Sequence, residues 1–303
     1  MLANTSKAYD PIAYNNGGVW PFLTGFAAMG EYQYHRSISG FHHLLETARL
    51  AEADALGFSS EIWSGDYYRP LDTSVPHQLF SSGMTISPFM RGLVGLSGDA
   101  ISRRLTLAPH LPEAWDSVDV KRYRVGEETF SLALSKSAES FKAIIDGSNE
   151  TSYELIFSPG LPPLSTIRSV AVNGRPAQFK AETSGQDIHA TLKTALSKRT
   201  EIEIKFSAGV EVDVPVPDVK TGARTEGMKV LGLEQISDGV KLTVEGLVGR
   251  KYRLRARSGS LALKAEGARA ISSTGPWKEF EIDFEGLAPG TYVKKTIQLV
   301  RSR

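Results

Sequence analysis

The sequence predicts an α+β protein in which a helical first third precedes two antiparallel β-sandwich units. In the first third, apolar residues recur at three- and four-residue intervals, which is the period of a helix. From about Arg103 apolar and polar residues alternate, as in strands, and Gly, Pro and Asp-Gly separate the alternating runs. We therefore expect helices in 1–102, a sandwich in 103–212 and a second sandwich-like unit in 213–303.

The composition is that of an ordinary globular protein. The chain has 303 residues, of which 41% are hydrophobic and 23% charged, and its formal net charge is +1. Because no strong field would attract phosphates, we expect no nucleic-acid or membrane partner. Cys is absent, which excludes thiolate chemistry and leaves the compartment open.

The start of the chain is polar and runs directly into an apolar helix. Met1 to Asn16 shows neither a signal peptide nor a membrane span, so localisation stays unknown. Two interpretations remain open: a short disordered tail, or a chain that begins in the middle of a domain.

The helical third begins with a predicted hairpin. A helix over 19–34 is apolar around most of its circumference, and Pro21 fits its first turn. Ser37 is expected to cap a second helix, for which Gly57 is a natural stop. A third apolar segment begins at Leu79, and Pro88 should interrupt it before it ends between Gly95 and Gly98.

The β units follow from alternation. The expected strands of the first unit are 105–107, 118–120, 122–125, 130–134, 141–145, 169–172, 188–192 and 200–206. Those of the second unit are 228–231, 240–244, 251–256, 260–263, 280–284 and 292–300. Residues 210–224, rich in Val, Pro and Asp, read as a linker or an exposed edge strand between the units.

The loop 58–78 is the strongest candidate for a site. Hydrolysis of a glycosidic bond needs two carboxyl groups, one as acid and one as base or nucleophile. Glu61 is the candidate carboxylate, and Trp63, Tyr67 and Tyr68 provide flat faces of the kind on which sugar rings stack.

Other acids in the same loop leave alternatives open. Asp66 and Asp72 could bind sugar hydroxyls or take the place of Glu61. All three acids could equally be ordinary solvated carboxylates, since most loop acids have no catalytic role. The density of aromatic residues, with one Arg and one His, favours a site.

Five segments in order resemble a known family. They are NNGGVWPF, SSEIWSG, PHQLFSSGM, LVGLSGDA and LTLAPHLPEAWDSVDVKRYRVG. Together, over about residues 14–145, they resemble the C-terminal end of the six-hairpin glycosidases, particularly the amylo-α-1,6-glucosidase or glycogen-debranching type. Asn15 departs from the His that is usual there. The residues that match the family motifs are Asn16, Gly17, Val19, Trp20, Pro21, Pro76, Gln78 and Ser81.

The resemblance implies a fold and a role for the loop. It implies a partial (α/α)6 barrel of about three helices, with Glu61 as the general base of an inverting reaction. The general acid has no candidate in this chain, so a missing N-terminal barrel portion becomes an expected partner. The chain alone should then be inactive, and its helices should expose a large apolar face.

We therefore interpret the sequence as the C-terminal fragment of a glycoside hydrolase acting on α-glucans, an oligo- or polysaccharide substrate, with no cofactor. The substrate-binding candidates are Asn16, Trp20, Trp63, Asp66, Tyr67, Tyr68, His77 and Gln78. Trehalose, mannoside or rhamnoside hydrolysis is a weaker reading.

A second class of function is a non-catalytic carbohydrate-binding or interaction protein built on the sandwiches. Trp115 and Trp277 would then mark sugar-binding faces, although tryptophans in sandwiches more often pack in the core or at an edge. No metal site is expected. His42 and His43 point about 100° apart on a helix and cannot share one ion.

Overall fold

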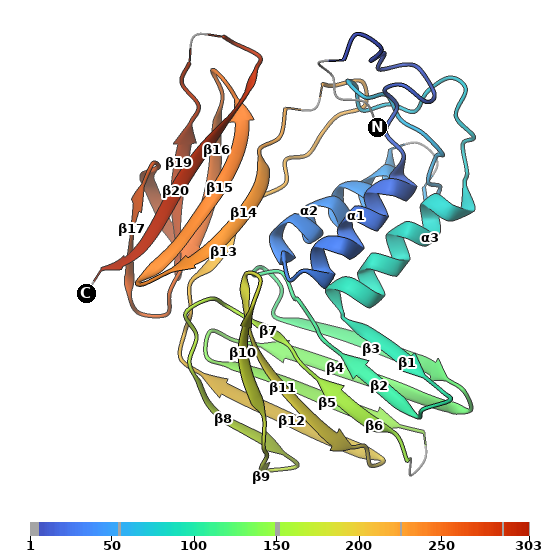
Figure 1. Cartoon of the computed structure of the whole chain (residues 1–303), viewed down its shortest axis with the longest axis vertical. Helices are drawn as coiled ribbons and strands as arrows, with labels where there is room; N and C mark the ends of the chain where they lie inside the picture. Colours follow the sequence, from blue (N-terminus) through green and yellow to red (C-terminus); the bar gives the residue numbers. More distant parts are fainter. Residues whose placement is uncertain (1–5, 54–55, 149–151, 225, 287, 303) are drawn as a thin grey trace.

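The computed structural model describes residues 6–53, 56–148, 152–224, 226–286 and 288–302 (Figure 1). Strands dominate this part of the chain, where they form four sheets. Its α-helices are α1 (Pro21–Gln33), α2 (Ser37–Arg49) and α3 (Leu79–Ser87). Two short helical segments, η1 (Leu50–Glu52) and the π-helical η2 (Pro88–Leu93), follow α2 and α3.

The helices agree with the periodicity, but the cap expected at the start of α2 does not form. Pro21 opens α1, and α3 stops at Ser87 where Pro88 begins η2, as expected from the missing N–H of proline. Ser37, however, is the first residue of α2 and provides no side-chain cap. Its hydroxyl interacts instead with the carboxyl of Asp187.

The first sandwich follows the helices. One sheet has the order β1 (Leu96–Asp99), β2 (Arg104–Leu107), β6 (Glu154–Phe157), β11 (Asp187–Ala195) and β10 (Lys180–Ser184), and β7 (Gly160–Leu161) pairs with β11. The other has the order β3 (Ser117–Val125), β4 (Glu128–Lys136), β5 (Ser140–Gly147), β12 (Arg199–Phe206), β8 (Ile167–Val172) and β9 (Arg175–Pro176). Alternation places Phe130, Leu132 and Leu134 of β4 in the core. The β2–β6 pair is parallel.

The second sandwich has its own core. One sheet has the order β13 (Glu211–Asp213), β16 (Lys251–Arg257), β19 (Trp277–Asp283) and β18 (Arg269–Thr274). The other has the order β14 (Lys229–Ile236), β15 (Gly239–Leu247), β20 (Tyr292–Ser302) and β17 (Ala262–Glu266). Val240, Leu242 and Val244 of β15 are fully buried between them. The segment expected to be a linker or edge contains β13, an edge strand paired with β16.

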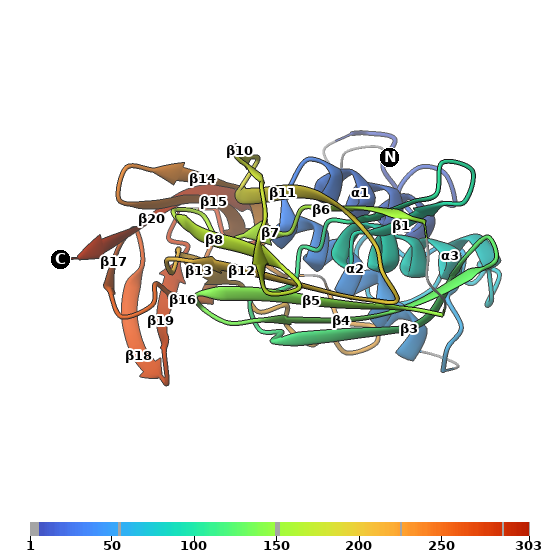
Figure 2. The same cartoon turned by 90° about the horizontal axis from the view of Figure 1, so that it is seen from below.

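The expectation of a partial (α/α)6 barrel is wrong. The three helices form one layer in the angle between the two sandwiches, where strands rather than further helices cover them (Figures 1 and 2). Tyr32 and Leu44 belong to the core of the first sandwich, and Ile38 packs against that of the second. Ser39 Oγ donates to Val230 O of β14 at 2.9 Å. The fold is therefore a pair of β-sandwiches with a helical layer.

The outer surface of the helical layer is apolar, as expected. Leu23 and Phe26 of α1 and Leu79 and Ile86 of α3 are 47%, 52%, 81% and 63% exposed. Across the described residues, we find no helix with the length and apolar character that crossing a bilayer requires.

Candidate functional site

The structure brings the two sequence constellations together. Val19 and Trp63 form an antiparallel bridge in which each backbone N–H donates to the other carbonyl at 2.8 Å. This bridge fixes the loop 58–78 against the start of α1. Trp63 forms a second bridge with Pro70, so the loop folds back on itself.

Glu61 lies in the loop with two polar partners. Its side chain is largely buried, and Gln78 Nε2 donates to Oε1 at 3.4 Å. The Tyr14 hydroxyl also interacts with this carboxylate, and that interaction, followed by partial burial, raises the pKa of Tyr14. Sequence reasoning missed Tyr14, whose one available signal was its position two residues before Asn16.

The aromatic residues divide into exposed and buried rings. Tyr14 is 38% exposed and meets the half-buried Trp20 edge to face, with ring centroids 4.9 Å apart. Trp63 is only 3% exposed and packs against Tyr68 at 5.0 Å. Tyr14 and Trp20 therefore offer surface for a sugar ring, whereas the ring of Trp63 supports the loop from inside.

Asp66 and Tyr67 are fixed by segments outside the loop. The Tyr9 hydroxyl donates to Asp66 Oδ1 at 2.7 Å, and burial together with this bond raises the pKa of Tyr9 to about 12. Arg224 lies 3.7 Å from Asp66 Oδ2, and its guanidinium lies 5.3 Å from the centroid of the Tyr67 ring. These contacts hold one end of the loop against the segment that connects the sandwiches.

The other predicted residues are peripheral. The Asn16 and His77 side chains are exposed, and the His77 ring packs on Phe58 at 4.4 Å. Asp72 is almost fully exposed and pairs with Arg69 at 3.8 Å.

The remaining candidates of the sequence are engaged elsewhere. The ring of Trp115 packs against Phe41 and Phe89 beside the first core, with centroids 5.9 and 6.5 Å away. The guanidinium groups of two arginines of β16 stack on the Trp277 ring at 4.4 and 5.0 Å. His42 Nε2 lies 2.8 Å from Val214 O, so it joins α2 to the second sandwich.

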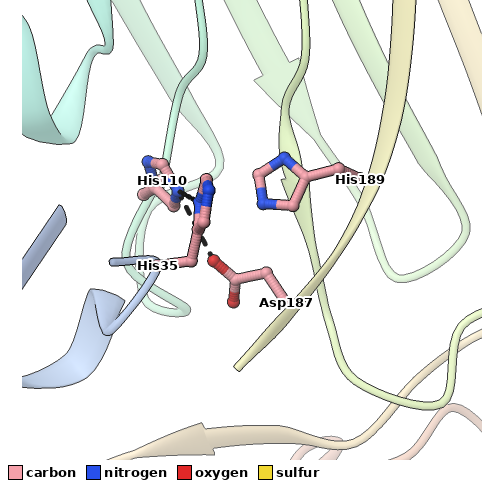
Figure 3. A group of neighbouring side chains, drawn as sticks. All are labelled: His35, His110, Asp187 and His189. Carbon is pink, nitrogen blue, oxygen red and sulfur yellow. Dashed lines mark hydrogen bonds and ion pairs between the residues drawn. The ribbon is translucent and has the colours of Figure 1, made fainter. Parts of the chain in front are cut away.

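A group of four polar residues was not anticipated from the sequence (Figure 3). It consists of His35 in the turn between α1 and α2, His110 after β2, and Asp187 and His189 on β11. One potential ligand atom from each residue lies within 4.8 Å of those of the others. Only Asp187 and His189 are close in sequence. Their spacing of two residues places both side chains on one face of a strand, and nothing in the sequence connects them with His35 or His110.

Comparisons with known proteins identify no family. No protein-family model matches the sequence, and no curated protein matches it. Among solved structures, the α-L-rhamnosidase from Dictyoglumus thermophilum is similar over 46% of this chain and 16% of its own length, with 12% identity and a TM-score of 0.31. The matched part is thus a small fraction of that enzyme, and a similarity of this size supports no conclusion on fold or function.

Proposed function

We propose that this chain carries the general-base half of a glycoside hydrolase site for α-glucans, with Glu61 as the base. The proposal is supported by the position of Glu61, which is held by Gln78 and Tyr14 where the two motif-bearing segments meet. The rings of the exposed Tyr14 and the half-buried Trp20 lie beside each other and offer a stacking surface for a pyranose.

The reaction is an inverting hydrolysis. Water attacks the anomeric carbon from the side opposite the leaving oxygen, and its proton passes to Glu61. The bond to the leaving oxygen breaks, and a second carboxyl group donates a proton to that oxygen. Asp66 is poorly suited to this second role, because the Tyr9 hydroxyl and the Arg224 guanidinium both present hydrogens to it.

A glycosyl fluoride tests the base separately from the acid. Fluoride leaves without protonation, so α-maltosyl fluoride requires only attack by water and removal of the proton of that water. The C–F bond breaks with its electron pair on fluoride, and inversion gives β-maltose. We expect the purified chain to release fluoride and to leave maltooligosaccharides intact. The rate is measured with a fluoride electrode and the anomer by NMR.

Glu61→Gln should reduce fluoride release by at least about 100-fold, because general-base catalysis contributes roughly 10²–10⁴-fold. Asp72→Asn is the matched control, since Asp72 lies in the same loop and is 94% exposed. Its rate should equal that of the unmodified chain. Fluoride release at the spontaneous rate, or equal rates for Glu61→Gln and the unmodified chain, would refute the proposal.

A further inference from the structure

The cluster of His35, His110, Asp187 and His189 brings together three segments of the fold. Asp187 and His189 project from the same face of β11, and His110 follows β2, which β6 separates from β11 in the sheet. His35 comes from the helical layer, where its positive φ of 54° turns the chain between α1 and α2. Gly185 permits this approach, because a Cβ there would lie 2.8 Å from the His35 Cβ.

One tautomer of His189 satisfies its contacts with Ser158. Nδ1 lies 3.2 Å from both the carbonyl oxygen and the Oγ of Ser158, and a proton on Nδ1 would be donated to the carbonyl oxygen, which can only accept. Its Nε2 lone pair is then left in the cluster, where this buried atom has no hydrogen-bond partner among the described residues. A histidine fixed through one nitrogen with the other free inside the protein is arranged as a metal ligand.

The other three residues point into the same space (Figure 3). His35 Nδ1 lies 2.9 Å from His110 Nε2, and His110 Nε2 lies 3.5 Å from Asp187 Oδ2. Oδ2 is buried, and the Ser37 hydroxyl also interacts with this carboxyl. Ligands about 2.0–2.1 Å from a tetrahedral ion lie roughly 3.3–3.4 Å apart. Separations of up to 4.8 Å within the cluster would have to shorten by as much as about 1.4 Å to give that arrangement.

The cluster is largely enclosed by protein. His110, Asp187 and His189 are buried, and His35 is half-buried. Polar groups in such a place need partners, and a divalent cation would bind one atom from each of the four side chains.

We propose that these four side chains form a zinc site. Three imidazole nitrogens and one carboxylate oxygen that lie within 4.8 Å of one another suit Zn²⁺ better than Ca²⁺ or Mg²⁺, which prefer oxygen ligands in larger numbers. With four protein ligands the site would be structural and would fix the α1–α2 turn to the first sandwich. The residues that flank His35 in sequence, Tyr34 and Arg36, line an open cavity together with Gly185 and Gln186.

Zinc binding by the chelator-stripped full chain is the direct test. We expect one zinc per chain by elemental analysis after dialysis. We also expect Tm to rise by about 5 °C or more once free zinc exceeds Kd by about 100-fold. Cobalt should substitute and give the intense visible bands of a four-coordinate ion, a readout that adventitious surface binding does not produce.

Asp187→Asn and His189→Gln should each weaken zinc binding by at least about 100-fold, since changes behind a ligand alone cost roughly 10–100-fold. His77→Gln is the control, because His77 is an exposed histidine outside the cluster. The unmodified chain provides the thermal and cobalt tests even if a variant fails to fold. Absence of a Tm shift and of the cobalt bands, or zinc affinity unchanged in His189→Gln, would overturn the proposal.

Discussion

Glu113 shows how a single half-buried residue couples the layers of the molecule. Its Oε2 lies 2.7 Å from Lys136 Nζ at the end of β4, and its carboxyl also contacts that of Glu211 on β13. Glu211 is paired in turn with Arg257 of β16. Burial outweighs the attraction of Lys136 and raises the pKa of Glu113 to about 7.

The raised pKa of Glu113 predicts a loss of stability as pH rises. The folded state holds the Glu113 proton more tightly than the unfolded chain, so its stabilising effect is complete below about pH 4.5 and is lost as pH rises to about 7. The change in the free energy of unfolding should be on the order of 1–3 kcal/mol. Histidines with lowered pKa, His110 and His189 among them, change stability in the opposite direction over this range. The contribution of Glu113 is therefore measured as the difference between the unmodified chain and Glu113→Gln in urea denaturation at pH 5 and pH 8.

Glu113→Gln should remove this pH dependence, although losing the partner of Lys136 lowers stability at every pH. Glu127→Gln is the control because Glu127 is 96% exposed. The same pH slope in Glu113→Gln as in the unmodified chain would contradict the assignment.

At the scale of elements, the junction from η2 to β1 shows what local sequence leaves undetermined. The apolar run through Leu96 predicts a helix that ends between Gly95 and Gly98, but η2 stops at Leu93 and β1 begins at Leu96. Gly95 makes the change of direction with a φ of 66°. Its carbonyl oxygen accepts a hydrogen bond from the Ala108 N–H at 2.8 Å beside the β1–β2 pair, and a Cβ on Gly95 would lie 1.9 Å from the Ala108 oxygen.

Gly95→Ala should therefore destabilise the chain by about 2–4 kcal/mol, because the new methyl group meets backbone atoms and the φ is unfavourable for alanine. Gly83→Ala provides the opposite case. Gly83 lies within α3, and a Cβ added there would have nothing within 4 Å. Alanine should therefore stabilise the helix by about 0.5–1 kcal/mol. Thermal denaturation of both variants measures the difference, and equal Tm values would contradict it.

The periodicity of the sequence determines elements more reliably than their partners. The break at Pro88 and the strand at Thr200 to Phe206 depend on local chemistry, and both are found. The parallel β2–β6 pair and the histidine cluster depend on residues far apart in sequence, and neither was expected. An apolar helix face predicts that another element covers it, but the sequence does not show whether that element is a helix or a sheet.

At the scale of the whole molecule, the helical layer is covered on its inner side and apolar on its outer side. The ring of Phe22 contacts the rings of Phe26 and Phe80 there, with centroids 4.9 Å apart in each pair. Leu79 and Ile86 project from α3 beside them and are largely exposed. Exposed apolar surface of this kind lowers solubility.

The double substitution Leu79→Lys and Ile86→Lys should raise the concentration at which the protein begins to aggregate, as measured by light scattering. Stability should change by no more than about 0.5 kcal/mol per site, since both side chains are exposed. Leu44→Lys is the contrast, because Leu44 is buried in the first core and should not tolerate a charge. Unchanged aggregation of the double variant would show that this face does not limit solubility.

The position of Arg224 bears on how the chain can be divided for expression. Arg224 lies beyond the first sandwich, yet it pairs with Asp66 and Tyr67 near the start of the chain, and the Tyr68 N–H donates to Ala223 O at 2.8 Å. A truncation after the last strand of the first sandwich would therefore leave the loop of Glu61 without this support. The segment that connects the two sandwiches therefore supports the loop of Glu61, and any shortened version of the chain has to retain residues up to 224.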